Sequence, residues 1–311
     1  MRLASIIFLI SISMAQDMQV KYVVAYMIDV DWGGEIETVS EITAAPGYAR
    51  FNGKLNPKRW IFRIFGGERG MLKVPGTENA MGYSAKRKTY WITPSGEFPL
   101  FADKDWGREQ EDETEEKEES TEISITTETS EKEKKGSKSV RKNQFSELTK
   151  NVFENDDATP QIERILSDGT EIINGFRTNK WTTTISTKTN KLIVDEWMVD
   201  ELPLRDTLYS YLGPILDNGS MESFSLQKFS SHDFIKGVDS TYTFEPSNES
   251  IVLAKLLVDS DNSWIQSASF EIRELYTVPF DASSFTIPEE YERIEIDEEE
   301  PDLGGKDKEA D

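Results

Sequence analysis

The chain has a single histidine, His232, which lies in the stretch "FSSHDF" between Ser231 and Asp233. Serine, histidine and aspartate together are the groups of a nucleophilic hydrolase. Neighbours in sequence rarely reach the geometry of a catalytic triad, however, and the chain has no Gly-x-Ser-x-Gly turn to present a nucleophile. We therefore interpret His232 as a structural or solvent-facing residue. One histidine also excludes a histidine-rich metal site.

Carboxylates are abundant, with 58 Asp and Glu residues in the chain. A glycoside hydrolase needs two of them facing one cleft, and abundance in an acidic chain does not indicate such a pair. There is no cysteine, which excludes disulfides, thiol catalysis and thiolate metal sites. Glycine patterns of nucleotide-binding loops and the acidic pattern of a calcium loop are also missing. We therefore predict no enzymatic activity, no cofactor and no metal, with a carboxylate hydrolase as an open alternative.

Aromatic residues lie on or beside most of the predicted strands and can bind apolar ligands. One interpretation is ordinary core packing. The other is an apolar cavity between a curved sheet and a covering helix, which would hold an acyl chain by area and shape without a catalytic motif. The residues predicted to line that cavity are Tyr22, Tyr26, Trp60, Phe62, Trp91, Trp181 and Trp197.

The elements that would carry these aromatics are mostly strands. Residues 20–30 place Val, Tyr and Ile at every second position, which is typical of a strand with one buried face. A turn at 32–34 and a glycine-rich turn at 66–70 help to divide the first hundred residues into an antiparallel meander. Its further strands are predicted at 35–43, 48–55, 59–65, 71–74 and 88–93.

The second half of the chain is predicted to add two hairpins and the helices. The first hairpin has strands at 171–187 and 192–199 with its turn at 188–191, and Asn174-Gly175 is interpreted as a local irregularity. The second hairpin has strands at 251–259 and 264–276. Residues 203–216 form a helix with an apolar stripe, and 145–153 form a shorter one.

These elements define a mainly β, α+β fold in which a strongly curved antiparallel sheet, or incomplete barrel, is covered by one to three helices. Regular alternation of strands and helices is missing, which argues against a parallel α/β sheet.

The amino terminus predicts export. Met1-Arg2 precedes a short apolar run, and Ser13 and Ala15 suit cleavage of a signal peptide at 1–15. A single domain would span 16–292, interrupted by a charged, disordered insertion at 107–142, with an acidic disordered tail at 293–311. The mature chain should be periplasmic or secreted, with no transmembrane segment and no lipid-anchored cysteine. Its net charge of −23 argues against nucleic-acid binding.

Three short phrases resemble an exported bacterial family of unknown function related to the LolA and LolB lipoprotein carriers. They are "INGFRTNKW" at 173–181, "DEWMV" with "ELP" at 195–203, and "FTIPEEY" at 285–291. The resemblance implies a LolA-like curved sheet covered by a few helices around an apolar interior, which in the carriers takes acyl chains. The charged insertion and the strongly acidic balance depart from the carrier pattern.

The sequence thus predicts an exported, non-enzymatic protein that binds a lipid or another hydrophobic small molecule. The alternative is a structural or interaction protein of the cell envelope. Its core would be filled, and its acidic segments would bind an envelope protein partner.

Overall fold

The computed structural model describes residues 18–59, 67–77, 79–93, 144–154, 156, 158–216, 229–239 and 249–295. The predicted signal peptide and the charged insertion at 107–142 lie outside these ranges, as does the acidic tail beyond residue 295. Trp60 and Phe62 also lie outside them, together with nearly all of the strand predicted at 59–65.

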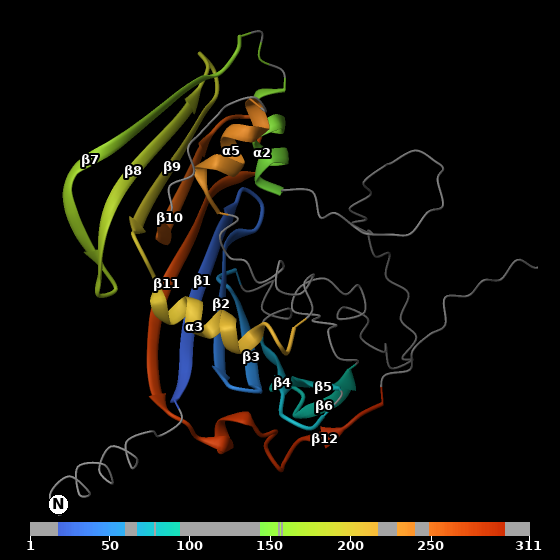
Figure 1. The fold of residues 1–311 in the computed structure, drawn as a ribbon. Coiled ribbons are helices and arrows are strands. Elements are labelled where there is room, and N and C mark those ends of the chain that lie inside the picture. The colour runs from blue at the N-terminus through green and yellow to red at the C-terminus, as the bar shows by residue number, and fades with distance from the viewer. Residues whose placement is uncertain are drawn as a thin grey trace, which may run out of the picture.

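The described strands form one open sheet in the order β12-β6-β5-β4-β3-β2-β1-β11-β10-β9-β8-β7, and its strong curvature is visible in Figure 1. Neighbouring strands are antiparallel except for β12 and β6, which pair in parallel. This architecture confirms the predicted mainly β class with a curved, unclosed sheet. The strands are β1 (Met18–Val30), β2 (Gly34–Ala45), β3 (Tyr48–Pro57), β4 (Gly67–Lys73), β5 (Ala80–Ser84), β6 (Thr89–Thr93), β7 (Gln161–Ile173), β8 (Phe176–Ser186), β9 (Lys191–Val199), β10 (Ser250–Asp259), β11 (Ile265–Pro279) and β12 (Glu292–Arg293).

The amino-terminal meander was predicted correctly in kind, with two errors. The glycine-rich stretch at 66–70 was predicted as a turn, but β4 begins at Gly67. Glycine is required at Gly70 for close packing, because a Cβ there would lie 2.4 Å from the Tyr83 ring and 2.3 Å from the Phe51 carbonyl oxygen. Strand β5 was missed, since it is short and has a glycine at its centre.

The hairpin region also differs from the prediction. Asn174 and Gly175, with φ of 48° and 86°, form the tight turn between β7 and β8 rather than an irregularity within a strand. Two residues with positive φ are what a two-residue hairpin of right-handed twist requires. The predicted turn near residue 188 is also present and joins β8 to β9, so the region contains three strands instead of two.

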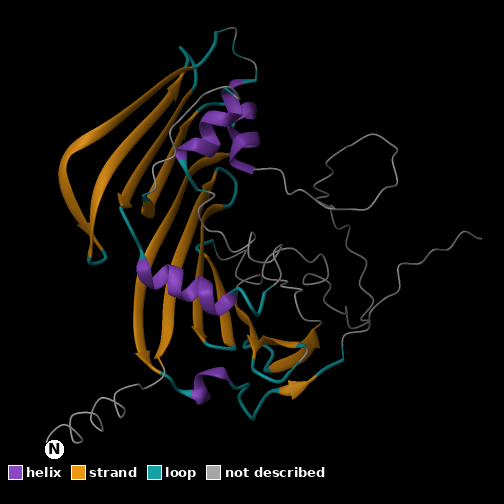
Figure 2. Cartoon of the chain, in the orientation of Figure 1, coloured by secondary structure: helices purple, strands orange, loops and turns teal. Residues whose placement is uncertain are grey.

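Three described α-helices lie on the inner side of the curved sheet (Figure 2). They are α2 (Gln144–Phe153), α3 (Pro203–Leu212) and α5 (Ser231–Val238). The first two confirm predicted helices, although α3 ends at Leu212 instead of residue 216. The third was not predicted. Figures 1 and 2 show α2 and α5 together at one end of the sheet and α3 lying across its middle.

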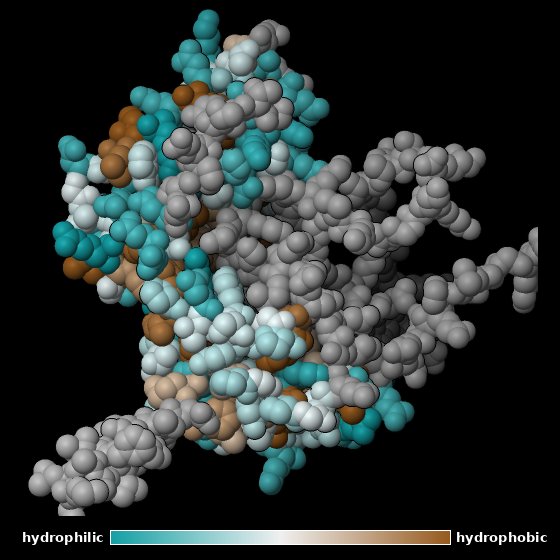
Figure 3. Space-filling model, viewed as in Figure 1, coloured by the Kyte–Doolittle hydropathy of each residue, from teal (hydrophilic) through white to brown (hydrophobic). Residues whose placement is uncertain are grey.

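Apolar residues pack on both faces of the sheet. The large core cluster lies between the inner face and the helices, and includes Tyr22, Leu208 and Phe234. A small cluster of Ala45, Leu72 and Phe285 lies on the outer face, where the short 3-10 helix η4 (Ala282–Phe285) covers β3. On the face shown in Figure 3, the described surface is mostly hydrophilic or neutral, with apolar residues in separate patches.

Candidate functional site

The inner face of the sheet carries four of the predicted aromatic residues. Antiparallel partners point to the same face of a sheet, so the strand register identifies which side chains share it. Tyr22 pairs with Ile42 and Tyr26 with Phe270, and all four belong to or pack on the core cluster beneath the helices. Both tyrosines therefore lie on the inner face of β1, where Tyr22 is only 1% exposed.

Trp181 and Trp91 lie on the same face at opposite ends of the sheet. Trp181 pairs with the buried Glu196 on β9. Trp91 is five strands away from β1 in the sheet order and packs on Gly82, where an added Cβ would lie 2.4 Å from the indole. The predicted lining residues therefore share a face but do not form one compact cluster.

Trp197 lies on the outer face, since it alternates with Glu196 along β9. Its indole Nε1 donates a hydrogen bond to Glu171 Oε2 at 2.9 Å. The ammonium groups of Lys180 and Lys255 lie 4.7 Å and 5.4 Å from its ring centroid, within the range of a cation–π contact. These contacts join Trp197 to β7, β8 and β10. Trp197 therefore packs on the outer face of the sheet and does not line the inner face.

Helix α3 places an arginine against the inner face. Its buried residues are Arg205, Leu208 and Leu212, at the spacing of one helical stripe. Arg205 is 9% exposed, and its Nη2 donates to Ser250 Oγ at 2.8 Å. Its Nε is buried and has no hydrogen-bond partner. In the described ranges, no ion pair involves Arg205.

Two tyrosines, Tyr22 and Tyr209, lie near this guanidinium. Tyr209, on the same helix, has its ring centroid 5.9 Å from Arg205 Cζ. Burial raises the pKa of Tyr22, Tyr26 and Tyr209, and Tyr209 further raises the pKa of the first two. The Arg205 charge acts in the opposite direction and lowers the pKa of Tyr22 and Tyr209. The site thus contains one positive charge beside neutral phenols, in a largely apolar environment.

Sequence reasoning missed Arg205, although a signal was present. Arg205 stands three positions before Leu208 and seven before Leu212, so it falls in the apolar stripe of the predicted helix. A charged residue in such a stripe is either at the rim of the core or buried for a specific purpose.

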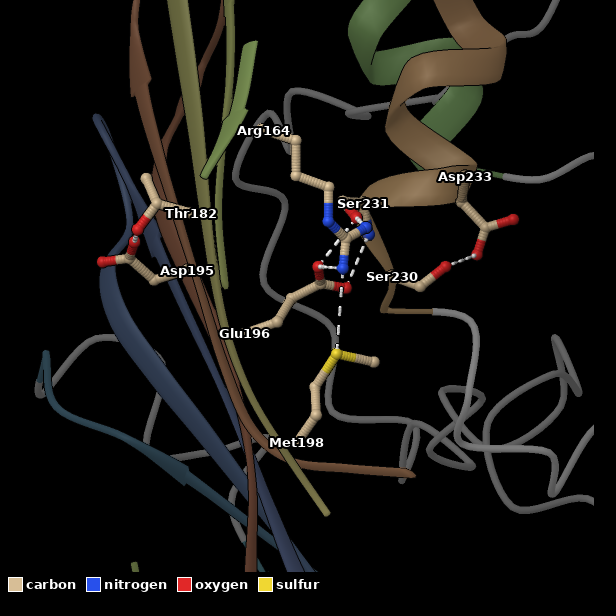
Figure 4. Close-up of polar contacts among 8 residues, drawn as sticks. All are labelled: Arg164, Thr182, Asp195, Glu196, Met198, Ser230, Ser231 and Asp233. Carbon is tan, nitrogen blue, oxygen red and sulfur yellow. Dashed lines mark hydrogen bonds and ion pairs between the residues drawn. The ribbon is translucent and has the colours of Figure 1, made fainter. Parts of the chain in front are cut away.

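A second polar cluster lies on the inner face where α5 meets β9 (Figure 4). The Glu196 carboxylate, 1% exposed, accepts from the Ser231 backbone N–H at 2.9 Å and from the Ser231 hydroxyl at 2.7 Å. Arg164 Nη2 forms an ion pair with Glu196 at 3.5 Å, and Nη1 donates to Ser231 Oγ at 3.1 Å. The guanidinium also lies 4.5 Å from the Trp181 ring centroid. This cluster connects the edge strand β7, the interior strand β9 and the start of α5.

The "FSSHDF" stretch forms the beginning of α5. The Ser230 hydroxyl donates to Asp233 Oδ2 at 3.1 Å, and the Ser231 hydroxyl donates to Glu196 (Figure 4). Both hydroxyls are therefore engaged with carboxylates instead of the His232 imidazole, which leaves neither serine activated as a nucleophile.

Two surface pockets lie away from the predicted aromatics. The larger, about 810 Å³, has walls of mixed polar and apolar character, mostly from α2 and the end of α5. The smaller, about 380 Å³, is apolar and lies on the outer face beneath the segment at 285–291. Neither is lined by Tyr22 or Tyr26, because α3 and the core close the inner face over these residues. In the parts of the chain that the structure describes, no group of three or more potential metal-ligating side chains is present.

Comparisons with known proteins place the chain in no characterised family. No family model matches it, and no curated protein matches it. Among solved structures, the chain is similar to a DUF1329 family protein from Desulfovibrio piger. The two are 10% identical, the alignment covers 90% of this chain and 93% of that one, and the TM-score is 0.25. The relation to LolA and LolB stays a sequence-based prediction. None of the described helices is long and apolar enough to cross a bilayer.

Proposed function

We propose that the protein is an exported, non-enzymatic binding protein that holds a hydrophobic ligand, a lipid or an acyl chain, on the inner face of its sheet beneath α3. The observation that carries this proposal is the inner face itself, where apolar side chains from β9, β10, β11, β1 and β2 form one continuous surface covered in its middle by α3. Such a surface binds apolar chains by area and shape.

Helix α3 is suited to act as a removable cover. It has only ten residues, and helices of that length are marginally stable without tertiary contacts. Leu208 and Leu212 attach it through apolar contact. Among the described residues, the side chains of α3 make one hydrogen bond to the sheet, from Arg205 to Ser250. The side chains of Thr207 and Ser210 bond only within the helix. Displacing α3 would therefore expose the apolar face at a modest cost in polar contacts.

The geometry also favours binding over catalysis. The hydroxyls of "FSSHDF" are engaged with carboxylates, and the most deeply buried carboxylate of the inner face, Glu196, is held by Arg164 and Ser231. A general acid or base needs a carboxyl group that can reach a substrate. Glu196 instead supports the docking of α5.

The second candidate is a structural or interaction protein of the envelope with a filled core. The tight packing of the inner face favours it, since Val24 and Tyr22 are 0% and 1% exposed. In that case α3 is a permanent part of the core.

Uptake of a fluorescent fatty-acyl probe by the delipidated protein distinguishes the two. Ser40 pairs with Val24, so it lies on the inner face and is only partly buried, and its neighbour Glu41 lies on the outer face. The variant Ser40→Trp should reduce uptake by filling space beside α3, whereas the matched control Glu41→Trp should not. Absence of uptake by the unmodified protein would overturn the binding proposal and favour the filled core.

A further inference from the structure

The guanidinium of Arg205 is buried, and no described residue forms an ion pair with it. Moving an ion out of water is costly unless the ion is paired and its hydrogen-bonding groups are satisfied. Arg205 is 9% exposed, bonds one serine hydroxyl, and leaves Nε without a partner. Arg205 acts electrostatically on Tyr22 and Tyr209, which are neutral phenols whose ionisation is opposed by burial. Among the residues that the structure describes, no carboxylate balances its charge in an ion pair.

The partly buried Arg164 is arranged differently. Arg164, on the same inner face, forms an ion pair with Glu196 and bonds Ser231. Arg164 thus has a carboxylate partner. The adjacent Asp206 does not supply the missing negative charge, because it is exposed and makes no ion pair with Arg205.

Arg205 lies where an amphiphile would place its head. The residue is at the start of α3, and its bond to Ser250 holds it at the first residue of β10. Leu208 and Leu212 continue from it along the same helical stripe, across the apolar face. A molecule with its anionic end at Arg205 would have its tail directed between α3 and the sheet.

We propose that Arg205 is the head-group site of the ligand, and that the ligand class is an anionic amphiphile with a carboxylate or phosphate on an acyl chain. This inference rests on the proposed function and adds the chemical class. An arginine fork binds either oxyanion with paired hydrogen bonds.

Calorimetric titration of the delipidated full-length protein tests the assignment with three probes: dodecanoate, dodecanol and inorganic phosphate. Hydrogen bonds to a charged group are worth enough to favour dodecanoate over dodecanol by roughly ten- to hundredfold. The variant Arg205→Met should remove this preference by weakening dodecanoate binding much more than dodecanol binding, and Arg205→Lys should retain part of the preference. Lys255→Met, which removes one outer-face charge, is the matched control and should keep the full preference. Circular dichroism establishes that each variant is folded.

The outcomes separate the head-group site from the proposed function. Equal binding of dodecanoate and dodecanol by the unmodified protein, or an undiminished preference in Arg205→Met, would refute the head-group site while leaving hydrophobic binding intact. Binding of neither amphiphile would refute both. Phosphate binding as tight as that of dodecanoate, lost in Arg205→Met, would show a site for a free anion and refute the amphiphile.

Discussion

Two arginines on the inner face of one sheet have opposite environments. Arg164 lies under α5 against a buried carboxylate, a serine hydroxyl and an indole ring. Arg205 belongs to α3 and lies beside tyrosines and one serine hydroxyl. No carboxylate of the described residues pairs with it. The first environment satisfies the charge within the protein. In the second environment, the described residues provide a hydrogen-bond acceptor but no negative charge to balance the guanidinium.

This difference indicates which helix is held firmly against the inner face. Helix α5 is joined to β9 by two hydrogen bonds, from the backbone N–H and the hydroxyl of Ser231 to the Glu196 carboxylate, and Arg164 of β7 forms an ion pair with the same carboxylate. Helix α3 is held to the sheet by apolar contact and the single bond to Ser250. The end under α5 is therefore built for stability, and the part under α3 is suited to opening.

The largest expected effect is the loss of the Glu196 carboxylate. Glu196→Ala would remove the ion pair that Arg164 makes with this carboxylate and both acceptors of Ser231. We expect the free energy of unfolding to fall by about 3–5 kcal/mol, measured by denaturant titration. In the double variant Glu196→Leu with Arg164→Met, most of this loss should be recovered, because the orphaned charge is removed as well. A loss below about 1 kcal/mol for Glu196→Ala would mean that the cluster does not stabilise the region under α5.

Truncating the apolar stripe of α3 should have the next largest effect. Leu208 is 0% exposed, and Leu208→Ala should lower the free energy of unfolding by about 2–5 kcal/mol through lost burial and a cavity. It should also accelerate uptake of an acyl probe, because the cover is held less tightly. Stopped-flow fluorescence measures the rate, and Leu204→Ala on the less buried side of the helix is the control. An unchanged uptake rate would contradict the role of α3 as the cover.

High pH should destabilise the fold through the inner-face tyrosines. The pKa of Tyr22, Tyr26 and Tyr209 is raised by burial above the usual value near 10. Above that pH the unfolded chain releases these protons while the folded chain retains them. Stability is therefore full below pH 10 and falls above it, by about 1.4 kcal/mol per pH unit for each such tyrosine. Alkaline unfolding monitored by tyrosinate absorbance should show less sensitivity in Tyr26→Phe. Equal sensitivity would show that Tyr26 ionises freely in the fold.

The outer-face tryptophan should matter less. Trp197→Phe removes the hydrogen bond to Glu171 and should cost about 1 kcal/mol in unfolding free energy. Ligand uptake should stay unchanged, since the residue faces away from α3. The matched inner-face variant Trp181→Phe tests whether the face, and not the loss of an indole, decides the result. A loss of uptake in Trp197→Phe alone would contradict this assignment of faces.

The smallest effect on stability is expected at Arg205. In the ligand-free protein, Arg205→Met should change the free energy of unfolding by less than about 1 kcal/mol, or increase it, because it removes an uncompensated charge and retains a flexible apolar side chain. A loss above about 3 kcal/mol in thermal or denaturant unfolding would give the guanidinium a structural role comparable to that of Arg164.

The sequence predicted the elements whose patterns are long and regular. Residues 20–30 place Val, Tyr or Ile at every second position and lie in β1, and the apolar stripe after Pro203 forms α3. Short elements and positive-φ glycines were less predictable. The turn at Asn174-Gly175 was overlooked because the threonine-rich stretch after it continues the strand pattern. Helix α5 was missed because its eight residues begin with Ser-His-Asp, which resembles a loop.

The candidate site was only partly predictable. Tyr22 and Tyr26 could be placed on one face from their period-two spacing. Trp197 was grouped with them by residue type, and its face depends on its alternation with Glu196 in β9. Arg205 depends on tertiary contacts, since only the pairing of α3 with the sheet shows that no carboxylate approaches it.

Mass spectrometry of material extracted from the protein, purified from the organism that makes it, tests the central claim most directly. We predict a co-purifying amphiphile with an acyl chain and an anionic head group, present in about one copy per chain and depleted in the Ser40→Trp variant. Protein that co-purifies with no such molecule, and after delipidation takes up no acyl probe, would contradict the account.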